Sequence, residues 1–187
     1  MAQLTIKILH SDGTEACSSG EDRVCLVFSG EYREGDAVVL ETSEKNLHLL
    51  FQPDDALGAS LVYLTENSLR YDVPFGEKKV CYSPKIFTGS MHYLYARLAT
   101  GEEIGAYRNL ALNAADQHGE THCYPHASAN VETRGESVFA ARNAIDGVVE
   151  NRSHGIWPYS SWGINRDPDA CFKLEFGREV EIDKIVL

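Results

Sequence analysis

Short apolar runs broken by turn-forming residues fill the first hundred positions of this 187-residue chain, and they limit its possible folds more than any other feature. Leu4, Ile6 and Ile8 alternate with polar residues, as in a half-buried strand, and a Ser-Asp-Gly turn follows. Similar runs recur at 23–28, 37–40, 47–51, 61–64, 73–75, 80–82 and 93–98. Strands of this length between Gly, Pro, Asn and Asp predict an all-β fold, with a β-sandwich or jelly roll over residues 1–99.

One helix is predicted after these strands, within a connecting segment at residues 100–124. Thr100 and Glu103 have the spacing of a capping box, in which each side chain accepts a hydrogen bond from the other residue's backbone amide. Ile104, Tyr107 and Ala111 then fall on one helical face, and the polar residues that follow end the helix. We expect this helix to pack across the first domain and to lead into a second.

The last third of the chain combines turn residues, aromatic residues and alternating apolar residues. Asp146 and Gly147 form a turn pair within the segment NAIDG, and two Trp and one Tyr lie close together at 154–162. The closing segment EVEIDKIVL, at 179–187, alternates apolar and charged residues and is predicted to be a strand. Such a strand at the end of the chain would expose an edge and an apolar face. One hypothesis is a homo-oligomer formed through this C-terminal edge, and another is that the first domain covers the apolar face.

Several motifs between residues 125 and 187 follow one another in a defined order. An alanine–serine segment at 127–131 precedes NAIDG at 143–147, Ser161-Trp162, and LEFGREVEIDKIVL at 174–187. Together they resemble the coagulation factor 5/8 type C family, or discoidin family, which includes many bacterial carbohydrate-binding modules. The resemblance implies a galactose-binding-like β-sandwich over residues 125–187. Family members usually continue for several more strands, so it also implies that this domain is incomplete at its C-terminus.

The same resemblance implies that loops at one end of the second domain hold a sugar. Trp157 and Tyr159 are the candidate platform for the apolar face of a pyranose ring. The alternative is packing in the core for Trp157, and packing in the core or at its rim for Tyr159. Trp162 is expected in the core, because its place in the pattern matches a Trp that packs there in the family. The candidate partners for sugar hydroxyls are His154, Asn165 and Arg166.

A non-catalytic carbohydrate-binding protein or module is therefore the expected function. The alternatives are a sugar-acting enzyme associated with glycoside hydrolysis and a protein-interaction domain. An enzyme would need two carboxylates roughly 5 to 10 Å apart, and no motif pairs the acidic residues of the second domain. The catalytic patterns GxSxG, HExxH and GxxxxGK[ST] are absent, so no catalytic residue is predicted.

A structural Ca²⁺ is also implied by the resemblance, in the loop that follows NAIDG. Ca²⁺ prefers several oxygen ligands, and a turn closed by an Asp side chain without any metal is the alternative. The oxygen ligands that this loop offers are Asp146, Asn151 and Ser153.

A transition-metal site is a separate hypothesis for the connecting segment, where four nitrogen and sulfur donors lie within nine residues. Gly119 and Pro125 prevent a regular helix there, and the spacing is not a recurring zinc pattern, so a polar loop is the alternative. The four donors are His118, His122, Cys123 and His126.

Charge and cysteine content limit the partners and the compartment. The chain has 17 Lys and Arg against 28 Asp and Glu, a net charge of −11, which disfavours nucleic acid and anionic membranes and suits a neutral ligand such as a sugar. Its five cysteines contain no CxxC pair, which predicts free, mostly buried thiols. No signal peptide or membrane-spanning run is visible, so we expect a cytoplasmic protein, or a secreted one if an export segment was removed.

Overall fold

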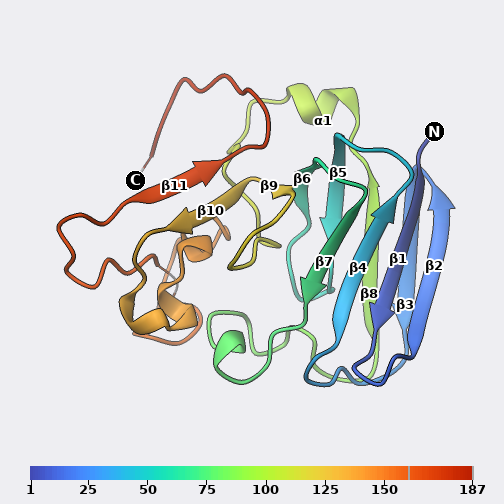
Figure 1. The fold of residues 1–187 in the computed structure, drawn as a ribbon, viewed down its shortest axis with the longest axis horizontal. Coiled ribbons are helices and arrows are strands. Elements are labelled where there is room, and N and C mark those ends of the chain that lie inside the picture. Colours follow the sequence, from blue (N-terminus) through green and yellow to red (C-terminus); the bar gives the residue numbers. More distant parts are fainter. Residues whose placement is uncertain (160, 187) are drawn as a thin grey trace.

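The computed structural model describes residues 1–159 and 161–186, which form an all-β fold of three antiparallel sheets (Figure 1). The first sheet has the strand order β2-β1-β4-β7, with β1 at Gln3–Leu9, β2 at Glu15–Glu21, β4 at Ala37–Thr42 and β7 at Ser68–Asp72. The second has the order β3-β8-β5-β6-β9, with β3 at Arg23–Phe28, β5 at Leu47–Gln52, β6 at Ser60–Leu64, β8 at His92–Leu98 and β9 at Cys123–Tyr124. The third pairs β10 (His126–Ala129) with β11 (Phe172–Glu175).

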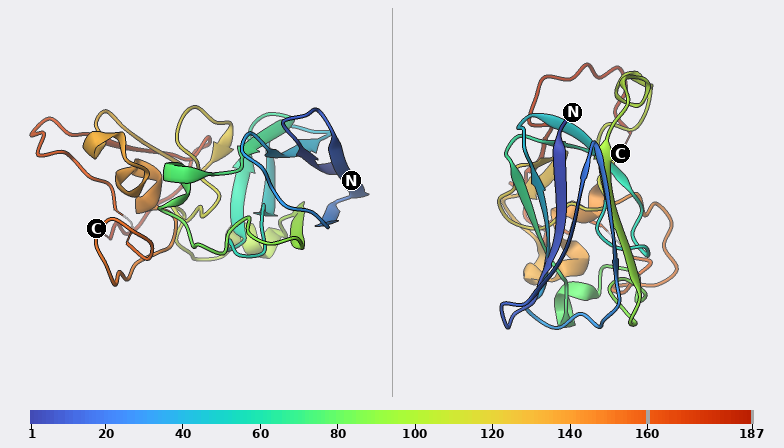
Figure 2. Two further views of the ribbon diagram at one scale, coloured as in Figure 1. Left: turned by 90° about the horizontal axis from the view of Figure 1, so that it is seen from below. Right: turned by 90° about the vertical axis from the view of Figure 1, so that its right-hand side faces the viewer.

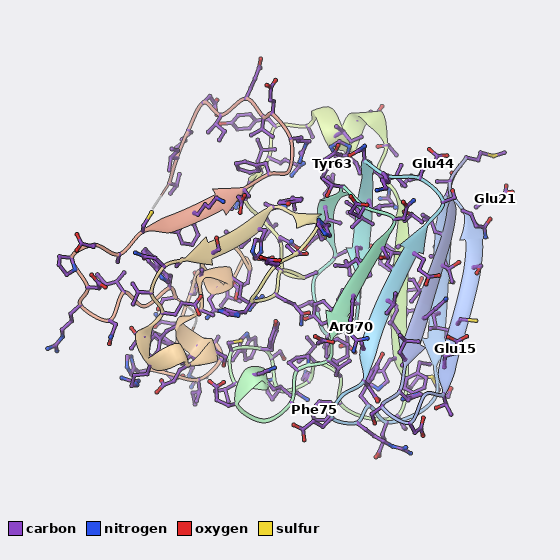
Figure 3. All side chains as sticks on the ribbon, in the orientation of Figure 1. Glu15, Glu21, Glu44, Tyr63, Arg70 and Phe75 are labelled. Atoms are coloured by element: carbon purple, nitrogen blue, oxygen red, sulfur yellow. The ribbon has the colours of Figure 1, made fainter. Side chains whose placement is uncertain are left out.

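The first two sheets pack face to face as a β-sandwich, as the right-hand view of Figure 2 shows. Leu4, Ile6 and Ile8 of β1 are fully buried, whereas the side chains between them face outward. Phe51 and Leu94 fill the same core from the second sheet, because alternate residues of a strand point to the same face. Figure 3 shows side chains along the sandwich, with Glu21 and Glu44 at one end and Phe75 at the other. The alternation in the sequence thus predicted the sandwich correctly.

Most of the predicted strands are confirmed, namely those that correspond to β1, β3, β4, β5, β6 and β8. The strands predicted at 73–75 and 80–82 are wrong: Pro74 lacks an amide for strand pairing, and a 3₁₀ helix, η1, occupies Gly76–Lys79. Strands β2 and β7 were not predicted. β2 is an edge strand of small and polar residues whose place is set by its pairing with β1.

Helix α1 (Gly101–Gly105) is shorter than the sequence predicts, although its start is correct. The capping box is confirmed: Glu103 N donates to Thr100 Oγ1 at 3.2 Å, and Thr100 N donates to Glu103 Oε2 at 2.8 Å. The backbone becomes extended at Ala106, and Ile104 and Tyr107 are 39% and 83% exposed. The predicted apolar face therefore does not pack across the sandwich.

After α1 the chain joins the sandwich again before it enters the third sheet. β9 pairs with β6, with Cys123 opposite Leu64, and β10 begins two residues after β9 ends. Three short 3₁₀ helices follow β10: η2 (Thr133–Gly135), η3 (Ser137–Phe139) and η4 (Ala141–Ala144). Trp162 packs in the small core of this region, and its Nε1 donates to Val131 O at 2.8 Å, which confirms its predicted structural role.

The strand predicted at 179–187 is wrong over its described residues, 179–186; Leu187 lies outside the residues that the structure describes. No strand pairs with 179–186, and Ile182, Ile185 and Val186 are 52%, 78% and 78% exposed. Alternating side chains do not form a strand without a neighbouring strand and a packing surface. The exposed edge on which the oligomer hypothesis rested is consequently not formed.

The five cysteines are unpaired. Cys81 and Cys123 are buried, whereas the remaining three are exposed, so the expectation of mostly buried thiols is wrong for Cys17, Cys25 and Cys171.

Candidate functional site

Three of the predicted sugar-binding residues lie on one loop, and the rings of two of them are in contact at a tilted angle. The rings of His154 and Tyr159 have centroids 4.8 Å apart, and both rings contact that of Phe139 at 6.1 and 6.2 Å. Tyr159 also packs against the main core. Trp157 is 36% exposed, and its backbone N–H donates to Val80 O at 3.2 Å. The indole is thus partly open to solvent, at the side of the loop that lies against the segment after η1.

The other two predicted sugar-binding residues, Asn165 and Arg166, lie on a neighbouring turn. Both are exposed and have positive φ angles of 49° and 58°. The Asn165 amide donates to Thr133 Oγ1 at 2.9 Å, and Gly163 lies so close to Phe139 that a Cβ there would be 2.8 Å from the Phe139 Cβ. The two loops therefore meet around Phe139.

Two of the three predicted Ca²⁺ ligands, Asp146 and Ser153, have separate local partners. Asp146 Oδ1 accepts a hydrogen bond from Val148 N at 2.8 Å, which is the metal-free turn considered as the alternative. Its Oδ2 lies 3.8 Å from Arg142 Nη1. Ser153 Oγ donates to Ile156 O at 3.1 Å, and Asn151 is exposed.

A larger feature is the histidine hollow, a concave site of about 470 Å³ beside β9 and β10. Loop residues 118–122 form one wall, and residues of β10 and β11 form others. The polar and charged side chains of its lining are three imidazoles, three carboxylates, one buried guanidinium and several hydroxyls. These residues are His118, His122, His126, Glu120, Glu132, Glu175, Arg142, Thr121, Ser128 and Tyr124.

The predicted transition-metal ligands are only partly brought together. The three histidines line the histidine hollow. Cys123, in contrast, is buried in β9, where it pairs with β6, and it lines a smaller pocket of about 90 Å³. Burial raises the pKa of the Cys123 thiol well above its ordinary value, which disfavours the thiolate that binds metals. Among the described residues, the donor atoms of these four side chains do not form a group of three within 4.8 Å of one another. The predicted four-donor site is therefore not assembled.

His126 is fixed at the wall of the histidine hollow by a buried carboxylate. Its Nδ1 donates to Asp116 Oδ1 at 2.7 Å, and Asp116 Oδ2 accepts from Ala127 N at 3.0 Å. The hydrogen bond to Asp116 raises the pKa of His126, and burial opposes this effect. At another wall, His118 Nε2 lies 3.2 Å from Glu132 Oε2, and Glu132 Oε1 accepts from Ala141 N at 2.8 Å. These contacts fix the positions of His126 and Glu132, both of which line the hollow.

Arg142 connects the hollow to the sandwich. Its Nε and Nη2 donate to the carbonyl oxygens of Asp116 and Ala114 at 2.7 and 3.1 Å, and its guanidinium lies 4.4 Å from the centre of the Tyr82 ring. Sequence reasoning missed the role of this residue and of Asp116, Glu132 and Glu175 in the hollow. The concentration of histidines at 118–126 was the only signal that pointed to this region.

None of the helices among the described residues is long and apolar enough to cross a lipid bilayer. Comparisons with family models, with curated proteins and with solved structures found no match for this chain.

Proposed function

We propose that the protein binds carbohydrate without catalysing its conversion, and that the sugar occupies the histidine hollow. The observation that carries this proposal is the combination of a volume of about 470 Å³ with a lining of imidazoles, carboxylates and hydroxyls. Small-molecule sites typically have volumes of roughly 300 to 1,000 Å³ with a few convergent polar groups. Sugar hydroxyls both donate and accept hydrogen bonds, so they suit a wall that offers both kinds of partner.

The electrostatics favour an uncharged ligand. The chain has a net charge of −11, and three carboxylates line the hollow, which disfavours phosphorylated or sulfated ligands. Arg142, the one guanidinium in the lining, already donates to backbone carbonyls and to Asn143 Oδ1. A neutral polyhydroxylated ligand requires no additional charge compensation.

The resemblance of residues 125–187 to discoidin domains supports sugar over other neutral ligands, because β10 and β11 of this segment supply two walls of the hollow. We place the ligand there and not on the Trp157 loop, since neither the histidine hollow nor the smaller pocket is lined by Trp157.

Glycan-array screening followed by calorimetric titration with the best oligosaccharide tests this proposal. The His122→Ala variant removes an exposed imidazole from the hollow while its backbone carbonyl still accepts from Thr65 N at 3.0 Å. We expect about tenfold weaker binding, the loss of roughly one hydrogen bond's free energy. Trp157→Ala is the matched control and should leave affinity unchanged. The reverse pattern would move the site to the Trp157 loop, and no binding to any glycan would refute carbohydrate recognition.

A sugar-acting enzyme is the second candidate, because Glu120, Glu132 and Glu175 line one hollow together with the Asp116–His126 pair. Glycoside hydrolysis uses two carboxyl groups on opposite sides of the scissile bond. Incubation with a panel of aryl glycosides distinguishes the candidates: hydrolysis that is lost in Glu175→Gln would establish the enzyme, and stable glycosides with measurable binding would establish the binding protein.

A further inference from the structure

We propose that Asp54, Asp55 and His92 bind a divalent transition-metal ion. Asp54 and Asp55 lie in the loop that connects β5 to β6, and His92 is the first residue of β8. One donor atom from each side chain lies within 4.8 Å of the other two, and they are the only three His, Cys, Asp or Glu side chains so arranged in the described part of the chain. This site lies in the sandwich and is separate from the histidine hollow.

The hydrogen bonds of His92 determine which of its ring nitrogens faces the carboxylates as an acceptor. Nε2 lies 3.1 Å from Gly89 O, and because a carbonyl oxygen can only accept, Nε2 carries the hydrogen. Nδ1 lies 3.1 Å from Asp54 Oδ2. In a neutral imidazole these two atoms are both acceptors, so a positive species must lie between them, either a second proton or a metal ion.

The geometry agrees with a metal ion in that position. Two ligands at about 2.1 Å from a Zn²⁺-like ion, at ordinary tetrahedral or octahedral angles, are separated by roughly 3.0 to 3.4 Å. Metal-ligating histidines also typically donate their second N–H to a carbonyl or carboxylate, as His92 does to Gly89 O. Asp54 is held in place in the same way, since its Oδ1 accepts from Ala56 N at 2.9 Å.

An independent observation comes from Tyr32, whose side chain packs against the site. Its ring lies edge-on to that of His92 with centroids 4.6 Å apart, and only 7% of the residue is exposed. The Tyr32 hydroxyl is buried without a hydrogen-bond partner in the described structure. Its contact with the His92 ring places the Tyr32 side chain beside the proposed ligands. A water molecule on the metal would supply the missing partner.

The other groups near these carboxylates are already engaged. Asp36 accepts from His10 Nδ1 at 2.9 Å and from the backbone amides of Ser11 and Arg33. The Lys79 ammonium, which interacts with Asp54 at longer range, donates to Thr88 Oγ1 at 2.7 Å. The candidate ligand set is one imidazole and two carboxylates, and Asp55 Oδ1 also accepts a hydrogen bond from Tyr93 N at 3.4 Å. Nitrogen and oxygen donors in this ratio suit Zn²⁺, Mn²⁺ or Co²⁺, whereas Ca²⁺ requires more oxygen ligands.

Calorimetric titration of chelator-treated protein with Zn²⁺ and with Mn²⁺ tests the site, together with visible absorption after addition of Co²⁺, which reports ligand number. We expect one ion per chain and at least about tenfold weaker binding in Asp55→Asn, a change at an exposed residue that spares the buried pair. Asp169→Asn removes an exposed carboxylate elsewhere and is the matched control.

Two results would overturn the proposal. One is no binding of any of the three metals to the wild-type protein, which would assign the His92–Asp54 contact to a protonated imidazole. The other is equal affinity and an equal Co²⁺ spectrum in the wild type and Asp55→Asn, which would place the ion elsewhere. Neither result bears on carbohydrate binding in the histidine hollow.

Discussion

His126 Nδ1 donates a 2.7 Å hydrogen bond to Asp116 Oδ1, and the two side chains are only 8% and 1% exposed. Because Asp116 also accepts from Ala127 N, this pair fixes the segment before the 118–122 loop to the start of β10. The contact therefore supports one wall of the histidine hollow, and it makes the stability of the fold depend on the protonation of His126.

Stability should decrease as pH rises through the pKa of His126. The Asp116 hydrogen bond raises this pKa above its ordinary value of 6.5, so the folded state favours the protonated ring. The contribution is fully present below pH 6.5 and is lost as pH rises through the folded-state pKa. Urea unfolding across this range should show the decrease, and His126→Gln should remove it. An NMR titration that gives His126 a pKa at or below 6.5 would contradict the prediction.

Replacement of Arg142 by Met should destabilise the protein by about 3 to 5 kcal/mol, the usual cost of breaking a buried charged network. The substitution leaves the carbonyls of Asp116 and Ala114 without their donors and removes the contact with the Tyr82 ring. Chemical denaturation measures the effect. Arg152→Ala, at an exposed position, should change the free energy of unfolding by less than about 0.5 kcal/mol. Equal effects of the two changes would argue against the network.

Gly177→Ala should be more destabilising than Gly135→Ala, although both glycines have a φ of +66°. A Cβ at Gly177 would lie 2.4 Å from Tyr124 Cδ2, whereas one at Gly135 would contact nothing within 4 Å. Both variants incur the backbone cost of about 1 kcal/mol or more, and Gly177→Ala should add about 1 to 2 kcal/mol from the clash. Thermal unfolding compares them. Tyr124 lines the histidine hollow, so Gly177→Ala should also weaken ligand binding.

Acid should disrupt the start of α1 only at very low pH. The bidentate contact with Arg97 and the hydrogen bond from Thr100 N lower the pKa of Glu103 to about 2. Because the pKa is depressed, the contribution of Glu103 is present above the ordinary value of 4.5 and is lost as pH falls through about 2. A carboxyl NMR titration should show this value, and Arg97→Met should return it toward 4.5. An unchanged value in Arg97→Met would exclude the ion pair as the cause.

The sequence predicted those parts of the fold in which local pattern and tertiary packing agree. Leu4, Ile6 and Ile8 could be assigned to one buried face because strand side chains alternate whatever their neighbours are. The Thr100–Glu103 capping box was readable for a similar reason, since both partners lie within one helical turn. Trp162 was placed correctly in the core through its position in the discoidin-like pattern.

Strand predictions based on the sequence pattern failed where the structure provides no neighbouring strand. Residues 179–183 alternate as those of β1 do, yet no strand pairs with residues 179–186, and they remain irregular. The strands predicted at 73–75 and 80–82 are also absent, because Pro74 lacks an amide for strand pairing and the 3₁₀ helix η1 separates the two segments. Apolar periodicity predicts a face to be buried, but it does not provide the neighbouring strand that completes the hydrogen bonds.

By itself, the sequence determined the all-β class, the faces of most strands and the start of α1, because these depend on residues close together in the chain. The two candidate sites were decided only by the tertiary structure. The histidine hollow forms because β9 returns to the sandwich and β11 pairs with β10, which brings Glu175 near His118 and His122. Asp54 and His92 meet across 38 residues because β5 and β8 are adjacent in one sheet, a pairing that hydrophobic alternation alone does not specify.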